Sequence, residues 1–333
     1  MTTRFWRTYS VVLLAVPLLM GQQGKLTGPV AGFVFDGSGR AVRPIQGVPG
    51  ASLLGDPVDF GFEITSAWVS PRQDSAFVIG ADRSLHLFSL KSGAAAEISL
   101  GGLTGVPQMV VFSPSGTAAA LVAAGKVRVI QKLPDAPVLV GTVSLPESGG
   151  VPARNNGVSR QILLRSPAVQ LAISDDGAYL LSAAAGSVRL LSTNGENRAL
   201  LPAGGDALVA FAAGGHDAAV MDSAAGLVLF HDVAGTATQQ PLAAADDSLA
   251  APAGLAFSQD GRALYVASSG AHSVAAFDLA GGGRSAIPCE CALTTLAPMG
   301  NLFRLNEPGA APLWLLDAGI NGPRIVFVPA RSE

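Results

Sequence analysis

A short turn-and-strand unit recurs along almost the whole chain, and this recurrence constrains the fold more than any other feature. In each copy an apolar run ends in a bulky residue, and a glycine follows after three intervening residues. Five copies keep this spacing, at residues 34–39, 111–116, 172–177, 210–215 and 256–261, and two degenerate copies, at 68–74 and 296–300, fill the gaps. Seven copies of one supersecondary unit predict a repeat architecture.

The length of the repeat indicates which architecture. From position 36 to position 298 the unit recurs in six steps of about 44 residues on average, the length of a four-stranded propeller blade. Gly116, Gly177 and Gly261 are each followed nine residues later by another glycine, an interval of one strand and its turn. Apolar or alternating runs follow these glycines, and helical periodicity is absent from this part of the sequence.

These patterns predict an all-β fold, a seven-bladed β-propeller of four-stranded antiparallel blades that occupies residues 29–330 as one domain. The expected blades are 29–64, 65–103, 107–146, 167–204, 206–245, 251–290 and 292–330. A length of 333 residues is compatible with two ordinary domains, but a propeller of this size is a single one. Two closures of the ring stay open: residues 324–328 complete their own blade, or residues 30–35 join that sheet as a latch.

Composition excludes several classes of protein. The chain is 49% hydrophobic and 14% charged, so it can bury a large core and is not disordered. Its net charge of −3 provides no basis for binding nucleic acid or anionic lipid.

One repeat also resembles a known family. Residues 256–279 contain a complete Ser-x-Asp-Gly-x-x-Leu-Tyr-Val core, with Ser258, Asp260 and Gly261 in the turn and residues 264–266 in the strand. This closely resembles the repeat of secreted Tyr-Val-Thr-Asn (YVTN) propellers and, more loosely, WD-type and lactonase-type propellers. The name-giving Val-Thr-Asn is Val-Ala-Ser here, at 266–268. The resemblance implies a propeller over residues 30–330 and says little about a ligand.

The first 23 residues have the layout of a secretory signal peptide. Arg4 and Arg7 precede an apolar run at residues 11–20, which ends at 21–24 (Gly-Gln-Gln-Gly), too short to span a bilayer. We therefore expect a secreted or periplasmic protein, with no membrane span in the mature chain. Removal of both arginines leaves 19 basic and 24 acidic residues, a net charge of −5.

Known catalytic motifs are missing. The sequence has no Gly-x-Ser-x-Gly, Gly-x-Gly-x-x-Gly, phosphate loop, Cys-x-x-Cys or His-Glu-x-x-His. Only four histidines occur, and no two have the spacing of metal ligands on one element. We therefore predict no catalytic residue, no metal site and no cofactor. Structural placement is expected for each histidine, and His231 with Asp232 is the nearest to a functional pair.

Repeated Ser and Asp residues have a structural and a functional interpretation. Hydroxyl and carboxylate oxygens in Ser258-Gln259-Asp260-Gly261 and Ser174-Asp175-Asp176-Gly177 suit calcium or a nucleophile. The same residues cap their own turns by binding backbone N–H groups, and repetition from blade to blade favours this second interpretation. The aspartates that end third strands, Asp232, Asp278 and Asp317, are interpreted in the same way.

Cys289 and Cys291 are the only cysteines and form a candidate disulfide. In an exported protein a pair so close should be oxidised. On one straight strand their Cα atoms would be about 6.6 Å apart, near the upper limit for a disulfide, so a bond favours a bend here. A structural bond is expected; a redox role and half of a metal site are the alternatives.

Two stretches break the repeat, residues 47–57 and 147–160. Insertions in repeat folds map to loops on one face, which is often the binding face. The second stretch provides the candidate binding residues Arg154, Asn155, Asn156 and Arg160, although arginines in such a loop are also commonly just solvated.

Three functions are compatible with this sequence. The leading hypothesis is an exported non-catalytic binding or scaffold module, monomeric, that binds an unknown protein or small-molecule partner through loops on one face and binds no nucleic acid. The alternative is a lactonase-like or quinone-dependent enzyme with its site in the central funnel. A carbohydrate-binding module is a third, but the sequence lacks the aromatic clusters that bind sugars. The lining of the funnel discriminates, because an enzyme needs convergent ionisable groups or a metal there.

Overall fold

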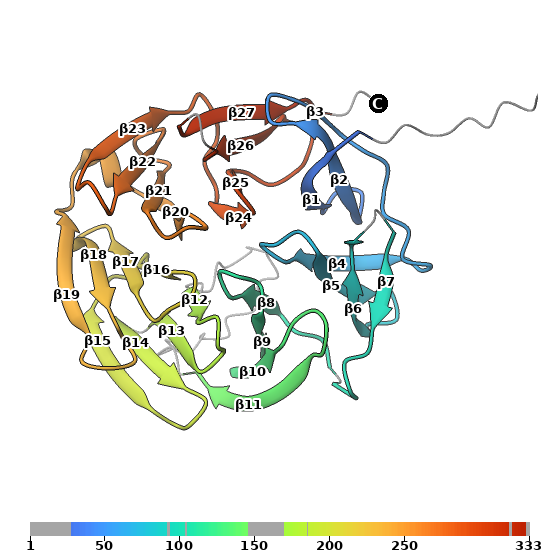
Figure 1. The fold of residues 1–333 in the computed structure, drawn as a ribbon, viewed down its shortest axis with the longest axis horizontal. Helices are drawn as coiled ribbons and strands as arrows, with labels where there is room; N and C mark the ends of the chain where they lie inside the picture. Colours follow the sequence, from blue (N-terminus) through green and yellow to red (C-terminus); the bar gives the residue numbers. More distant parts are fainter. Residues whose placement is uncertain are drawn as a thin grey trace, which may run out of the picture.

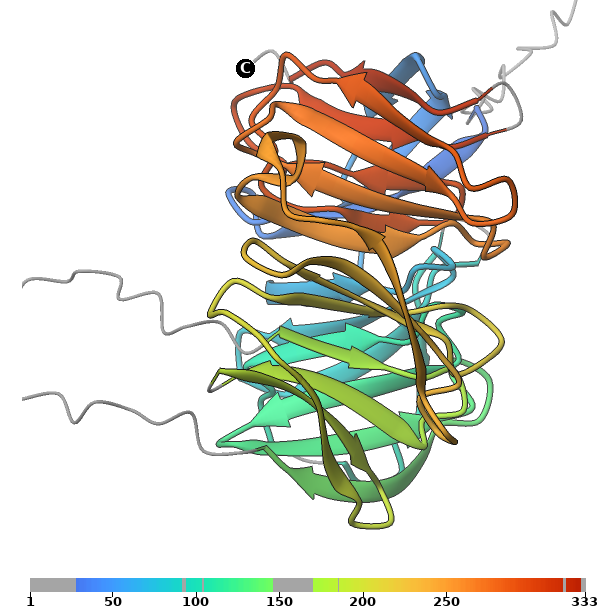
Figure 2. The same cartoon turned by 90° about the vertical axis from the view of Figure 1, so that its left-hand side faces the viewer.

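Seven antiparallel sheets stand around a common axis, as Figure 1 shows. The structure is a computed structural model that describes residues 28–91, 94–103, 105–145, 170–184, 186–319 and 322–330. The predicted seven-bladed β-propeller is confirmed. Figure 2 shows the ring turned by 90°, with the strands running between its two faces. The signal peptide predicted for residues 1–23 lies outside the described residues, and no helix within the described ranges could span a membrane.

The strands of the first four blades are β1 (Val30–Asp36), β2 (Ala41–Val48) and β3 (Ala51–Leu54); β4 (Ile64–Val69), β5 (Ser75–Gly80), β6 (Leu85–Ser89) and β7 (Ala96–Ile98); β8 (Met109–Phe112), β9 (Ala118–Ala123), β10 (Lys126–Gln131) and β11 (Val138–Ser144); β12 (Gln170–Ile173), β13 (Tyr179–Ala184), β14 (Ser187–Ser192) and β15 (Asn197–Pro202). Those of the last three are β16 (Leu208–Phe211), β17 (Ala218–Asp222), β18 (Gly226–His231) and β19 (Thr238–Ala243); β20 (Pro252–Phe257), β21 (Ala263–Ser268), β22 (Ser273–Asp278) and β23 (Arg284–Pro288); β24 (Ala297–Met299), β25 (Leu302–Arg304), β26 (Leu313–Asp317) and β27 (Arg324–Val328). A 3-10 turn, η2 (Asp247–Leu249), precedes the sixth blade.

Each sheet is a meander from the axis outward, so two faces of the ring can be defined. Turns between first and second strands, and between third and fourth strands, lie on what we call the turn face. Turns between second and third strands, and the links from blade to blade, lie on the opposite connector face. The repeated glycines lie in the turns between first and second strands, where Gly116, Gly177 and Gly261 have φ of 70, 64 and 69°. Such values favour glycine because it has no Cβ.

The first blade differs from the expected four strands. It contains three strands in the described residues, in the order β1-β2-β3, whereas the other six blades contain four. Residues 55–58 continue along β2, since the N–H of Gly55 and of Val58 donate to the carbonyls of Pro44 and Val42. Asp56 and Pro57 in this stretch disfavour a further regular strand. The irregular segment at 47–57 therefore shortens this blade.

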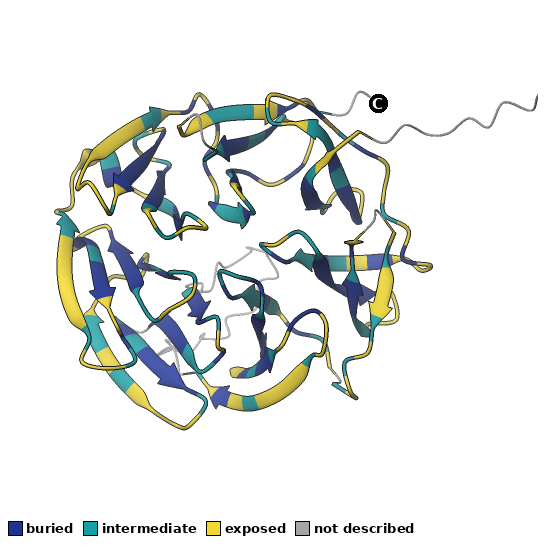
Figure 3. Cartoon of the chain, in the orientation of Figure 1, coloured by how far each residue is buried: buried dark blue, intermediate teal, exposed yellow. Residues whose placement is uncertain are grey.

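The core lies between neighbouring sheets. Figure 3 shows the middle strands buried and the outer strands largely exposed. Small side chains allow close packing there: Ala118, Ala119 and Ala120 on β9 are fully buried, as are Ala218 and Ala219 on β17. Each pair of adjacent blades thus buries one apolar layer, which the hydrophobic effect stabilises.

The ring closes through packing between its first and last blades. β27 pairs with β26 in its own sheet and β1 pairs with β2, so the last strand completes its own blade and β1 is not exchanged into it. Val34 and Ile45 of the first blade pack in one cluster with Met299 and Leu315 of the last. This layer covers the blade faces that an open ring would expose.

Candidate binding channel

A cavity of about 430 Å³ lies where the inner strands converge. β8, β12, β16, β20 and β24 contribute its wall, and the turns that follow β4, β8, β16 and β20 contribute its rim on the turn face. Every second residue of a strand points to the same side, so each inner strand offers only one or two side chains to the axis. The cavity is therefore assembled from the inner strands of five blades, their turns and the first turn of the second blade.

The wall of this channel is apolar. Val111, Leu171, Val209, Leu255 and Leu296 are among the residues that line it. Polar side chains occur mainly at the rim on the turn face, where Ser258, Gln259 and Arg72 contribute. Arg72 is the one charged residue among the described lining residues, and its Nη2 lies 2.7 Å from Oδ2 of Asp74. The channel thus offers an apolar surface with a polar rim.

The repeated Ser and Asp residues hold the turns at this rim. Ser258 Oγ donates to Asp260 Oδ1 at 2.6 Å and accepts from the N–H of Ala263 at 2.9 Å. Ser174 and Asp176 repeat the arrangement, with 2.6 Å between Ser174 Oγ and Asp176 Oδ1. The hydrogen bond from Ser258, then that from the Arg262 N–H, lowers the pKa of Asp260. The interpretation of these residues as turn caps is confirmed.

The third-strand aspartates also cap turns. Asp278 Oδ1 accepts from the N–H of Ala280 at 3.0 Å and of Gly281 at 2.9 Å, and Asp317 Oδ1 accepts from that of Gly319 at 3.1 Å. In the described residues no group of three or more His, Cys, Asp or Glu side chains is arranged to hold a metal ion.

One turn joins three blades. Asp175 Oδ1 accepts from the N–H and the Oγ–H of Ser115 in the third blade, at 2.7 and 2.6 Å. Its Oδ2 accepts from the N–H of Gly214 in the fifth blade at 2.8 Å. Asp176 contacts Nε2 of His216 at 2.9 Å, also in the fifth blade. Burial favours a higher pKa for Asp176, but hydrogen bonds from Ser174, Ala178 and His216 outweigh it and lower this pKa.

His231 pairs with a different aspartate from the one predicted. Its Nδ1 lies 3.0 Å from Oδ2 of Asp217 and its Nε2 lies 3.1 Å from Oε1 of Gln240. Asp232 instead donates its N–H to Asp217 and accepts from the N–H of Gly235 with its side chain. The adjacent Asp232 was a wrong partner because it lies beyond the end of β18, with φ of 48°, and its side chain caps the turn that follows. The hydrogen bond to Gln240, then that to Asp217, raises the pKa of His231.

A second polar group, on the connector face of the second blade, was missed by sequence reasoning. Ser84 Oγ lies 2.5 Å from His86 Nε2, and His86 Nδ1 lies 2.7 Å from Glu97 Oε1. The signal in the sequence is the Ser-x-His spacing, which places both side chains on one side of a strand. Glu97 could be added only once the pairing of β6 with β7 was known.

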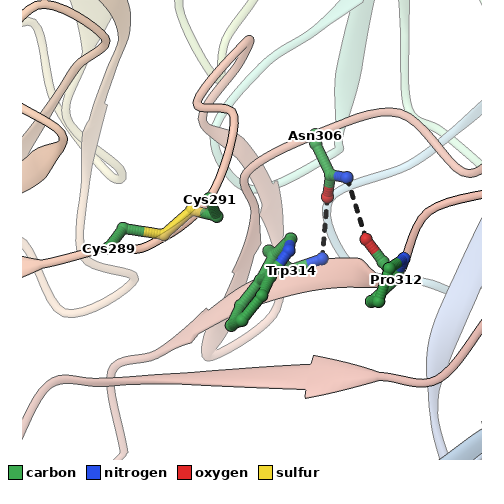
Figure 4. The surroundings of a disulfide bond; sticks show 5 residues. All are labelled: Cys289, Cys291, Asn306, Pro312 and Trp314. Carbon is green, nitrogen blue, oxygen red and sulfur yellow. Dashed lines mark hydrogen bonds between the residues drawn. A yellow bond between two sulfur atoms is a disulfide. The ribbon is translucent and has the colours of Figure 1, made fainter.

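The two cysteines form a disulfide in the link between the sixth and seventh blades (Figure 4). Their Cα atoms are 5.1 Å apart, closer than on a straight strand, so the chain bends here. Both residues are buried in the layer between these blades. Nearby, Asn306 holds the seventh blade: its amide donates to the carbonyl of Pro312 at 3.0 Å and accepts from the N–H of Trp314 at 2.7 Å.

The candidate binding residues Arg154, Asn155, Asn156 and Arg160 lie outside the described residues. Their role in binding stays a prediction.

Comparisons with known proteins identify the fold. No protein-family model and no curated protein matches the chain. Many solved structures match, among them three that each share 14% sequence identity with this chain. One is a functionally unknown protein from Desulfotomaculum acetoxidans (TM-score 0.53; 90% of this chain and 100% of the other), and another is a "putative 6-phosphogluconolactonase" from Bacteroides uniformis (0.54; 89% and 93%). The third is a protein from Lactobacillus plantarum (0.54; 90% and 95%). A sequence identity of 14% shows a shared β-propeller fold, but it does not show a shared activity.

Proposed function

We propose that this chain is an exported binding module, whose axial channel receives an apolar group of a small molecule or a partner protein without catalysing a reaction on it. One observation carries this proposal: five inner strands present apolar side chains to a cavity of about 430 Å³. Ligand sites commonly have volumes of about 300–1,000 Å³, mostly apolar walls and a few polar groups that orient the ligand. Gln259 and Ser258 at the rim supply such groups.

In this proposal, loops on one face add contacts with the bound molecule beyond those in the channel. A group held in the channel leaves the rest of its molecule against the rim, where loop residues can contact it. The insertion with Arg154 and Arg160 belongs to the link between the third and fourth blades, so we propose it as a separate contact for an anionic partner on the connector face. Replacement of both arginines by alanine should then weaken binding of that partner while the melting temperature stays the same.

Export is part of the proposal. The apolar run at residues 11–20 and the two preceding arginines support it. The disulfide between Cys289 and Cys291 supports it as well, because disulfides persist mainly outside the cytosol.

The alternative is a lactonase-like enzyme, which the similarity to the Bacteroides uniformis protein favours at the level of fold. A phosphorylated sugar lactone is polar and anionic, so its site would need several donors and cations. The described channel wall instead consists mainly of valine, leucine, phenylalanine and alanine. Desolvating a polar ligand against such a wall is unfavourable, and we therefore prefer an apolar ligand.

Binding of 1-anilinonaphthalene-8-sulfonate, followed by its fluorescence, tests the proposal. Ala297 lies on β24 and lines the channel, so Ala297→Phe should fill part of it and weaken the binding of the dye at least tenfold. Ala199→Phe is the matched control, because Ala199 lies exposed on the outer strand β15.

Equal affinity in the wild type and in both variants would contradict a site in the channel. Melting temperatures measured in parallel show whether Ala297→Phe keeps the fold. If that variant unfolds, Val209→Trp provides a second obstruction from β16.

A further inference from the structure

The connector face of the second blade carries three side chains in the order that activates a serine. Ser84 Oγ contacts His86 Nε2 at 2.5 Å, and the other ring nitrogen contacts Glu97 Oε1 at 2.7 Å. A hydroxyl beside an imidazole that a carboxylate orients is the arrangement used in nucleophilic catalysis. We propose that these residues form a hydrolytic site for carboxylic esters with apolar acyl groups, in which Ser84 is the nucleophile, His86 the general base and Glu97 a positioning residue. This site is separate from the axial channel.

The strands fix this geometry. Ser84 directly precedes β6 and His86 lies two residues later, so both side chains lie on the same side of the sheet. β7 pairs with β6 in a register that sets Glu97 opposite Phe88, one step diagonally from His86. The ring of Phe62 lies 4.7 Å from that of His86 and limits its rotation. The His86 side chain is 22% exposed, which leaves it accessible to a ligand.

A cavity adjoins His86 and Glu97, two of the three side chains. It measures about 380 Å³ and is lined by His86 and Glu97 together with Leu85, Ile98, Ser99, Leu100, Gly101 and Gly102. The leucines and the isoleucine offer an apolar surface to an acyl chain. A Cβ built on Gly101 or Gly102 would meet no atom within 4 Å, so the backbone there is open to an approaching carbonyl group.

The reaction needs no group beyond water and the ester. Nε2 of His86 takes the proton of Ser84 while Oγ bonds to the ester carbonyl carbon, and the C–O bond to the alcohol breaks as the alcohol receives that proton. Water then attacks the acyl group on Ser84 and gives a proton to Nε2. The carboxylic acid leaves, and the proton returns to Oγ. Glu97 accepts from Nδ1–H throughout and keeps the other ring nitrogen directed at Ser84.

Asp82 competes for the same proton. Its Oδ1 lies 2.5 Å from Ser84 Oγ and 2.9 Å from the N–H of Ser84. These two hydrogen bonds, the hydroxyl's first, lower the pKa of Asp82, so its carboxylate is an acceptor only. One hydroxyl proton cannot serve both Asp82 and His86. Asp82 therefore holds Ser84 in its less reactive state, and its removal should increase the reactivity of Ser84.

The chain contains its own control. Ser38 Oγ donates to Asp36 Oδ1 at 2.6 Å, two residues away, as Ser84 does to Asp82. The described partners of Ser38 include no imidazole. A difference in reactivity between the two serines would thus report the effect of His86 rather than that of the Ser-Asp turn.

Labelling with diisopropyl fluorophosphate, mapped by mass spectrometry of peptides, tests the proposal. Ser84 should be labelled and Ser38 should not. His86→Gln should slow the labelling of Ser84 by at least about 100-fold, the contribution of a general base, and Asp82→Ala should accelerate it. Hydrolysis of p-nitrophenyl butyrate should be lost in Ser84→Ala and retained in Ser38→Ala, which changes the control turn of the first blade.

Labelling of Ser38 at the rate of Ser84, or an unchanged rate in a folded His86→Gln variant, would overturn the proposal. If His86→Gln does not fold, labelling of the Glu97→Gln variant provides the test instead. It should slow the labelling and shift the pH of half-maximal rate downward, because Asp82 would be the one remaining carboxylate in contact with the Ser84–His86 pair. A rate and a pH profile equal to those of the wild type would refute the assignment.

Discussion

Single carboxylates link the blades to one another at the turn face. The side chain of Asp175 receives three hydrogen bonds from two neighbouring blades. Because each blade is a local meander, contacts of this kind supplement the apolar layers and fix the angle between blades. The residue therefore has a structural role.

Asp175→Ala tests this role. The variant leaves the N–H groups of Ser115 and Gly214 without their acceptor, so the free energy of unfolding in urea should fall by about 1–3 kcal/mol. Asp135→Ala is the control, because its side chain is 80% exposed and contacts only Lys91 at 3.5 Å among the described ion pairs. That variant should change the free energy by less than about 0.5 kcal/mol. Equal effects would contradict the linking role.

His231 should make stability depend weakly on pH. Its pKa is raised in the folded protein, so its contribution is complete below the pKa of the unfolded chain and is lost as the pH rises through the folded pKa. The free energy of unfolding of the wild type, relative to His231→Asn, should therefore decrease when the pH increases from about 5 to about 8. The effect should be small because the side chain is 45% exposed. A difference that grows with pH would contradict this sign.

At the scale of the strand, the inner strands approach one another closely at the axis. A Cβ built on Gly254 of β20 would meet the backbone nitrogen and the Cβ of Leu296, directly before β24. Gly254→Ala should therefore overpack this contact and lower the free energy of unfolding by about 1–3 kcal/mol. Gly283→Ala is the matched control, since the nearest atom to its Cβ is 4.0 Å away. Denaturant unfolding of both variants would show whether the close approach exists.

The turns also explain how much of the fold could be predicted. Positive φ and the caps on Ser174 and Ser258 are local requirements, so their spacing alone predicted seven sheets. The strands of each sheet lie inside the range expected for its blade, except that β4 begins at Ile64, one residue before its range. The number of strands in the first blade, three rather than four, could not be predicted, because residues 47–57 follow no repeat. Pairings across strands could not be predicted: Asp217 with His231, and Glu97 with His86, depend on register, which the sequence of one strand does not contain.

At the scale of the whole molecule, the seam between the first and last blades closes the ring without an exchanged strand. Met299 is 4% exposed and packs there in one cluster with Val34 and Ile45. Met299→Ala should reduce the free energy of unfolding by about 2–5 kcal/mol, and amide hydrogen exchange should accelerate first in β1 and β25. Leu53→Ala, at a residue 62% exposed on β3 of the first blade, should have little effect. Uniform acceleration around the ring would indicate that the seam is not a separate weak point.

The two candidate sites lie in different parts of the closed ring. The apolar channel lies on the axis, and the Ser84 group lies on one blade at the opposite face from the channel rim. A crystal structure of the chain tests the closed ring most directly. It should show seven antiparallel sheets, with Met299 of the last blade packed against Val34 of the first. Six or eight sheets, or β1 paired with β27, would contradict the account.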